Sequence, residues 1–168
     1  LLYTSGHGGG YASTGSLLYP AGAFAGSLFV GTYSWSGEED IVTTGHSFAV
    51  RPQEFAFWYK YIPKNSDQFK AYIELRSGDE IIATGTFIPT AYSTADSDFK
   101  QATVLLEYIT LEKKATSVYV QFLSTTKTSF SSSDFDKNKS ITFPVMGSWN
   151  AHIGSMLYID DISLNYTK

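Results

Sequence analysis

Three tryptophans and a few polar side chains are the residues in this sequence whose chemistry could define a site. Sugars present C–H faces and a rim of hydroxyl groups, so a sugar site needs an aromatic ring flanked by planar polar side chains. Trp58 stands in a strand-like run, whereas Trp35 precedes a turn and Trp149 lies in a polar stretch. We predict Trp58, Trp35 and Trp149 as ligand contacts, the alternative being that each ring packs on the protein.

Alternation along one strand decides where Trp58 points. Four aromatic residues occupy every second position around it: Phe55, Phe57, Tyr59 and Tyr61. Side chains alternate between the two faces of a strand, so a core built from this ladder leaves Trp58 on the outer face. Tyr72, Glu74 and Arg76 lie on the polar face of the following strand, and we predict them as polar neighbours of Trp58.

Carboxylates raise the separate possibility of glycoside hydrolysis. That reaction needs two carboxyl groups, about 5–5.5 Å apart for retention or about 6.5–9.5 Å apart for inversion. The candidates are Glu54, Glu74 and Glu107, of which Glu74 and Glu107 are predicted to share one sheet surface. The alternative is that all three are ordinary residues of solvated sheet faces.

Composition limits the class of protein. The chain has 168 residues with 43% hydrophobic and 16% aromatic residues, which is enough for the core of one domain. The net charge is −4 and no basic cluster exceeds Lys113-Lys114, which argues against nucleic-acid binding. No apolar run approaches the roughly 20 residues of a membrane-spanning helix. Cysteine is absent, and the three histidines lack the spacing of zinc ligands.

Strand-like segments separated by turn residues extend along the chain. Residues 71–87 alternate around Ser77-Gly78-Asp79 and predict a hairpin. Further strands are expected at 27–33, 102–109, 118–122 and 156–166, whereas the first 20 residues are expected to be loop with short strands. Because no window keeps helical spacing, we predict an all-β antiparallel sandwich of jelly-roll type.

One connection in this scheme is unusually long. The residues between Leu123 and Ser155 are mostly polar, and they include Phe143, Trp149 and His152. Unstructured loops longer than about 15 residues are usually functional or mobile. We therefore predict a loop that covers the sheet as a lid or as one wall of a cleft.

Several short motifs follow one another in a definite order along the chain: residues 25–31, 48–52 and 59–61, then Asp67, residues 73–75 and 81–83, and the closing residues 154–161, Gly-Ser-Met-Leu-Tyr-Ile-Asp-Asp. Together and in this order they resemble the carbohydrate metabolism domain family of bacterial secreted or surface proteins. The resemblance covers about residues 20–166. The segment before Gly154 is longer than in the family, so a site built there would be particular to this chain.

The resemblance implies a jelly-roll (galactose-binding-like) domain similar to carbohydrate-binding modules. It also implies that residues 1–168 are a single domain, the C-terminal part of a longer exported protein, secreted or held on the outer surface of a bacterial cell. Its partners would be an oligosaccharide or polysaccharide and the other domains of the parent protein. Family members are often described as glycoside hydrolases, but the resemblance carries no catalytic motif over to this sequence.

Asp160 and Asp161 interrupt the last strand. Core positions shift there from odd to even numbers, which predicts a β-bulge. In jelly-roll modules similar to this one, a carboxylate of the last strand helps to hold a structural calcium, an ion that takes six or more oxygen ligands. The alternative is a buried aspartate that accepts backbone N–H bonds at the bulge. No cofactor is otherwise expected.

Three functions remain open at this point. The first is a non-catalytic glycan-binding domain, with Trp58, Trp35, Trp149, Tyr72 and Arg76 in contact with the sugar. The second is a glycoside hydrolase that uses two of the three glutamates. The third is a protein-interaction or adhesion module, which a flat apolar patch without a groove would favour.

Overall fold

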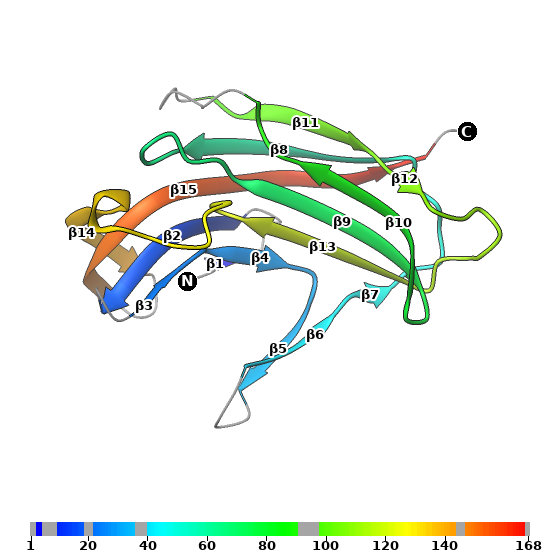
Figure 1. Ribbon diagram of the computed structural model, residues 1–168, viewed down its shortest axis with the longest axis horizontal. Coiled ribbons are helices and arrows are strands. Elements are labelled where there is room, and N and C mark those ends of the chain that lie inside the picture. Colours follow the sequence, from blue (N-terminus) through cyan, green and yellow to red (C-terminus); the bar gives the residue numbers. More distant parts are fainter. Residues whose placement is uncertain are drawn as a thin grey trace.

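The chain folds into antiparallel β-strands that build two main sheets (Figure 1). The computed structural model describes residues 3–4, 10–18, 22–35, 40–90, 98–143 and 147–166. The strands, in chain order, are β1 Tyr3–Thr4, β2 Gly10–Leu18, β3 Gly22–Phe24, β4 Ser27–Phe29, β5 Gly31–Trp35, β6 Asp40–Thr44, β7 His46–Ser47, β8 Glu54–Ile62, β9 Lys70–Ser77, β10 Glu80–Phe87, β11 Lys100–Leu105, β12 Glu107–Tyr108, β13 Ser117–Leu123, β14 Asp136–Phe143 and β15 Gly147–Asn165. A single 3₁₀ turn, Ser132–Asp134, completes the described elements.

Each main sheet has a defined strand order. Sheet A runs β1-β2-β15-β8-β11, with β14 beside β15 and β3 beside β2. Sheet B runs β12-β10-β9-β13-β4, with β7 beside β13. Strands β5 and β6 form a separate two-stranded ribbon, which projects from the two sheets in Figure 1. The all-β, antiparallel prediction is therefore confirmed.

The inner faces of the two sheets share one hydrophobic core. The predicted aromatic ladder of β8 points into it, with Phe55 and Phe57 fully buried and Tyr59 and Tyr61 nearly so. Phe57 meets Phe122 of sheet B edge-on, with ring centroids 5.0 Å apart. This cross-sheet contact makes the arrangement sandwich-like, and each sheet is left with one outer face that points away from the other sheet.

Gly85 allows the two sheets to approach each other at one edge. A Cβ at this position would lie 2.9 Å from Cγ1 of Val104 in sheet A and 3.0 Å from Cγ2 of Ile73. Both distances are shorter than ordinary van der Waals contact, so only a residue without a side chain fits here. The glycine therefore sets how closely β10 can lie against β11.

The hairpin and the alternation predicted around it are confirmed. Strands β9 and β10 pair from Ser77↔Glu80 to Ala71↔Phe87, with a register shift between Ile81 and Ala83. Gly78 in the turn has φ of +61°, a conformation that glycine adopts without steric cost. Residues 100–108 also alternate as predicted, although Leu106 separates β11 in sheet A from β12 in sheet B.

Three expectations about irregular structure are wrong. Residues 10–18, expected to be loop with only short strands, form the nine-residue strand β2 between β1 and β15. The predicted strand over 27–33 is divided into β4 and β5. The expected loop or lid between Leu123 and Ser155 contains β14, which pairs with the first part of β15. Backbone hydrogen bonds to neighbouring strands stabilise these polar segments, so side-chain alternation is a poor guide to them.

Candidate functional site

Trp58 stands on the outer face of sheet A, as predicted from its place in β8. The residue is 38% exposed, although its neighbours Phe57 and Tyr59 are buried. Strand pairing sets Gln101 of β11 opposite Trp58 on one side and Asp160 of β15 opposite it on the other. Directly opposed residues have Cβ atoms roughly 5 Å apart, so an amide and a carboxylate flank the indole. Both flanking residues are exposed.

A second aromatic residue continues this face along the strands. Lys60 follows Trp58 on the outer face and pairs with Tyr158 of β15. The Lys60 ammonium lies 5.9 Å from the centre of the Tyr158 ring, within the range of a cation–π contact. We call Trp58, Lys60, Gln101, Tyr158 and Asp160 the Trp58 face. The face thus combines two aromatic residues with hydrogen-bond donors, from Lys60 and Gln101, and acceptors, from Gln101 and Asp160.

The predicted bulge borders this face. The register of β15 against β8 shifts between Asp160, opposite Trp58, and Ser163, opposite Ala56. Asp161 has φ of +46°, which is uncommon for a residue other than glycine, and its backbone N–H donates to Oδ1 of Asp160 at 2.9 Å. The parity change is confirmed at Leu164, which packs against the same core as buried Leu157 and Ile159. Ile162 and Tyr166, also expected at core positions, are exposed. The bulge therefore fixes the backbone next to Trp58.

The calcium site considered for the aspartate pair stays a prediction. Among the described residues, no group of three or more histidine, cysteine, aspartate or glutamate residues could hold a metal ion. The alternative of a buried aspartate is wrong, since Asp160 and Asp161 are both exposed. The two carboxylates alone supply only part of the six or more oxygen ligands that calcium takes, and they are available to a bound molecule.

The predicted polar neighbours of Trp58 lie on the opposite side of the sandwich. Tyr72, Glu74 and Arg76 belong to β9 of sheet B, where Ile73 and Leu75 between them face the core. They therefore point outward from sheet B, whereas Trp58 points outward from sheet A. Alternation places each residue correctly on an outer face, but it does not reveal that the two strands belong to different sheets.

The three glutamates are divided in the same way. Glu54 shares its strand parity with Trp58 and lies on the outer face of sheet A, near Asn165. Glu74 and Glu107 share the outer face of sheet B, as predicted, with Thr84 paired between them. Glu74 is 5% exposed, so the expectation of a solvated side chain is wrong for this residue. Both of its carboxylate oxygens accept hydrogen bonds from neighbours on its own strand.

The other two tryptophans are placed only by their backbones. Trp35 ends β5 and pairs with Asp40, and Trp149 lies in β15 opposite Ile141. Their side chains lie outside the described part of the structure, and so does the contact predicted for each. Gln101 and Tyr158, in contrast, are site residues that local sequence patterns do not predict. Both lie at outer-face positions of alternating strands, which the sequence can indicate, but the register that sets Gln101 beside Trp58 and Tyr158 beside Lys60 depends on distant strands.

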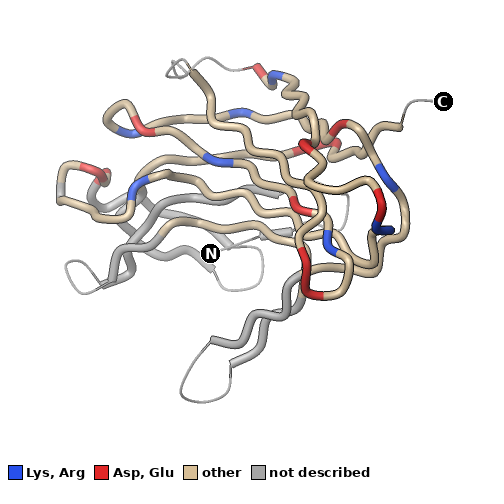
Figure 2. The backbone as a smooth tube through the Cα atoms, turned by 45° about the vertical axis from the view of Figure 1, so that its right-hand side comes forward, with Lys and Arg blue, Asp and Glu red and all other residues tan. Residues whose placement is uncertain are grey.

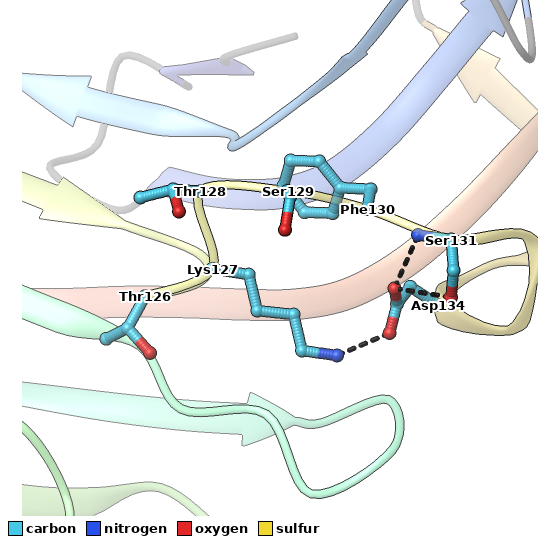
Figure 3. Close-up of a pocket in the computed structure, with 7 residues that line it drawn as sticks. All are labelled: Thr126, Lys127, Thr128, Ser129, Phe130, Ser131 and Asp134. Carbon is cyan, nitrogen blue, oxygen red and sulfur yellow. Dashed lines mark hydrogen bonds and ion pairs between the residues drawn. The ribbon is translucent and has the colours of Figure 1, made fainter.

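One open pocket of about 520 Å³ lies elsewhere, in the loop after β13 (Figure 3). Residues 126–131 line it together with Asp134. Its two charged groups, Lys127 and Asp134, form an ion pair with each other, and the Phe130 ring packs against Phe135 at 5.8 Å. These contacts stabilise the loop and leave the charged groups less available to a ligand. The pocket is therefore a weaker site candidate than the Trp58 face.

This loop should contribute pH-dependent stability through Asp134. The hydrogen bond from Lys127, followed by that from the Ser131 backbone N–H, lowers the Asp134 pKa to about 2. A lowered pKa stabilises the folded state above about pH 4, and the contribution is lost as the pH falls through about 2. We expect Asp134→Asn to cost about 1 kcal/mol at pH 6 and nothing below pH 2, measured by urea unfolding. An equal cost at both pH values would contradict this assignment.

Comparisons with models of known protein families, with curated proteins and with solved structures found no match. The resemblance to the carbohydrate metabolism domain family therefore stays a prediction from the motifs. Within the described residues, no helix is long and apolar enough to span a membrane.

Proposed function

We propose that this chain is a glycan-binding domain that contacts an oligosaccharide or polysaccharide through the Trp58 face. The observation that carries the proposal is the half-exposed indole between an amide and a carboxylate, Gln101 and Asp160. The ring would stack on the C–H face of a sugar, and the two planar polar groups would hydrogen-bond its hydroxyls. Such a domain would serve a secreted or surface protein of a bacterium by bringing its other domains to a carbohydrate.

The strand order supports a jelly roll as the fold of this domain. Eight strands remain when β1, β3, β7, β12, β14 and the separate β5-β6 ribbon are left out: β2, β4, β8, β9, β10, β11, β13 and β15. If these eight strands are numbered 1 to 8 in chain order, their spatial order is 1-8-3-6 in sheet A and 5-4-7-2 in sheet B. Eight strands in two sheets with two Greek keys define the jelly roll, an architecture common among lectin domains.

Hydrolysis receives less support than binding. Glu54 lies on the other side of the sandwich from Glu74 and Glu107, so it cannot form a pair with either of them. Glu74 and Glu107 are two strand spacings apart, roughly 10 Å between Cα atoms. Both oxygens of Glu74 are hydrogen-bonded beneath Tyr72 and Arg76, so this carboxylate is not presented to a substrate. We therefore assign no acid–base pair.

Binding of the whole chain to cellulose, xylan, mannan and chitin oligosaccharides, measured by calorimetry, tests the proposal. For the sugar that binds, Trp58→Ala should weaken affinity at least about tenfold, since a stacked ring contributes more than about 1.4 kcal/mol. Gln101→Ala and Asp160→Ala should each weaken it about three- to tenfold, because each removes one hydrogen bond.

Tyr166→Ala is the matched control for these variants. Tyr166 is an aromatic residue with 47% exposure just beyond the end of β15, away from Trp58, and its loss should leave affinity unchanged. Sugar binding that Trp58→Ala does not alter would remove the Trp58 face as the site. Binding to none of the sugars would favour the adhesion module instead.

A further inference from the structure

The outer face of sheet B carries a second set of groups suited to a ligand. Strand β9 places every second residue on this face: Lys70, Tyr72, Glu74 and Arg76. Strand β13 sets Tyr119 opposite Glu74 and Gln121 opposite Tyr72. Strand β10 sets Thr84 and Thr86 on the other side of the same pair. The face therefore presents two phenol rings, hydroxyls, an amide and two cations in adjoining rows.

Glu74 holds two of these groups in place. Its Oε2 accepts a hydrogen bond from the Tyr72 hydroxyl at 2.7 Å, and its Oε1 accepts one from Nε of Arg76 at 2.5 Å. Transfer of a carboxylate out of water is costly unless such partners compensate it. A glutamate that is 95% buried on the outside of a sheet is thus a positioning residue for Tyr72 and Arg76.

The same contacts move the pKa values of both partners further from the physiological range. Burial, and then the hydrogen bond to Glu74, raises the pKa of Tyr72 to about 12. The hydrogen bond to Glu74 also raises the pKa of Arg76. Tyr72 therefore stays neutral and Arg76 stays charged at any physiological pH. Arg76 uses Nε for Glu74, and its side chain remains 35% exposed, which leaves its two Nη groups for another acceptor.

A second cation lies at the other end of the row. The Lys70 ammonium lies 5.4 Å from the centre of the Tyr72 ring. Lys70 and Arg76 are six residues apart along an extended strand, roughly 20 Å between Cα atoms. Charged residues are otherwise sparse along the middle of the strands (Figure 2). Two cations and one carboxylate leave this row with a net charge of +1, and exposed Glu107 bounds it next to Thr84 on edge strand β12.

We propose that the outer face of sheet B is a second binding surface, which takes an acidic polysaccharide built from uronic acids. A guanidinium matches a carboxylate with two parallel hydrogen bonds, so Arg76 would bind one uronate and Lys70 another. The rings of Tyr72 and Tyr119, 6.3 Å apart and nearly perpendicular, would meet the sugar faces between them. This surface lies opposite the Trp58 face and does not depend on the function proposed for it.

Calorimetric titration of the whole chain with polygalacturonate, alginate and hyaluronate tests the second surface. Fully methyl-esterified polygalacturonate is the uncharged control and should bind at least about tenfold more weakly. Lys70→Gln should weaken uronate binding about threefold, as expected for one exposed ion pair. Lys114→Gln is the matched control, because Lys114 is an exposed lysine outside the strands of both sheets, and affinity should be unchanged.

Arg76→Gln alone would leave the buried Glu74 carboxylate without its cation and could unfold the chain. The double variant Glu74→Gln/Arg76→Gln avoids this and should weaken uronate binding about tenfold or more. Three outcomes would overturn the second surface: no binding of any of the three uronates, equal binding of the methyl ester, or loss of uronate binding in Trp58→Ala but not in Lys70→Gln. The last of these would move the acidic ligand to the Trp58 face.

Discussion

Replacing Asp67 by alanine should lower the free energy of unfolding by about 3 to 5 kcal/mol, which is a large part of the stability of a domain of this size. Asp67 is 5% exposed, and both of its oxygens accept hydrogen bonds. Oδ1 accepts from the Thr125 hydroxyl and the Gln68 N–H, each at 2.8 Å, and Oδ2 accepts from the Ser155 hydroxyl at 2.7 Å. Alanine would leave these buried donors unpaired. Urea unfolding followed by circular dichroism measures the loss.

Two variants bracket this expectation. Asp67→Asn keeps one acceptor oxygen and should cost about half as much, since fewer donors lose their partner. Glu80→Ala removes an exposed carboxylate whose ion pair with Lys113 is solvated, and it should cost less than about 0.5 kcal/mol. If the free energy of unfolding of Asp67→Ala lay within about 0.5 kcal/mol of the wild-type value, the network would contribute no net stability.

The Asp67 network explains why distant motifs of the sequence belong together. The Tyr61 hydroxyl donates to the Ser124 carbonyl at 3.0 Å, and the Ser155 hydroxyl oxygen accepts from the Lys64 N–H at 3.0 Å. Burial raises the pKa of Tyr61 far above its usual range, so its hydroxyl remains a donor. Asp67 and the Gly154-Ser155 pair are among the residues on which the family resemblance depends. The hydrogen bond between Ser155 and Asp67 therefore joins two segments that are 88 residues apart in the chain.

Alternation predicted the inner and outer faces of this fold well. The aromatic ladder of β8 and the parity change at Asp160-Asp161 each follow from one strand considered alone, and the β9-β10 hairpin follows from two strands joined by a short turn. A buried face must be apolar at every second position, and a bulge is the simple way to change its parity. These features therefore required no knowledge of which strands are neighbours.

The composition of the site could not be predicted in the same way. Trp58 and Tyr72 are 14 positions apart in successive strands, yet β8 and β9 belong to different sheets and their outer faces point in opposite directions. The neighbours of Trp58 come instead from β11 and β15, about 40 and 100 residues away along the chain. Long-range register depends on the packing of the whole sandwich, which local patterns do not record.

Phe57→Ala should destabilise the chain by about 3 to 5 kcal/mol, whereas the adjacent change Trp58→Ala should cost less than about 1 kcal/mol. The Phe57 ring is fully buried, with centroids 5.0 to 6.0 Å from those of Phe55, Tyr59, Phe87 and Phe122. Its removal would leave a cavity between the two sheets, while Trp58 is largely outside that core. Sugar binding should show the reverse order. Folded Phe57→Ala should keep its affinity for the sugar, whereas Trp58→Ala should lose it. Urea unfolding and calorimetry on both proteins would decide the point, because equal stabilities would mean that rings 57 and 58 do not occupy opposite faces of β8.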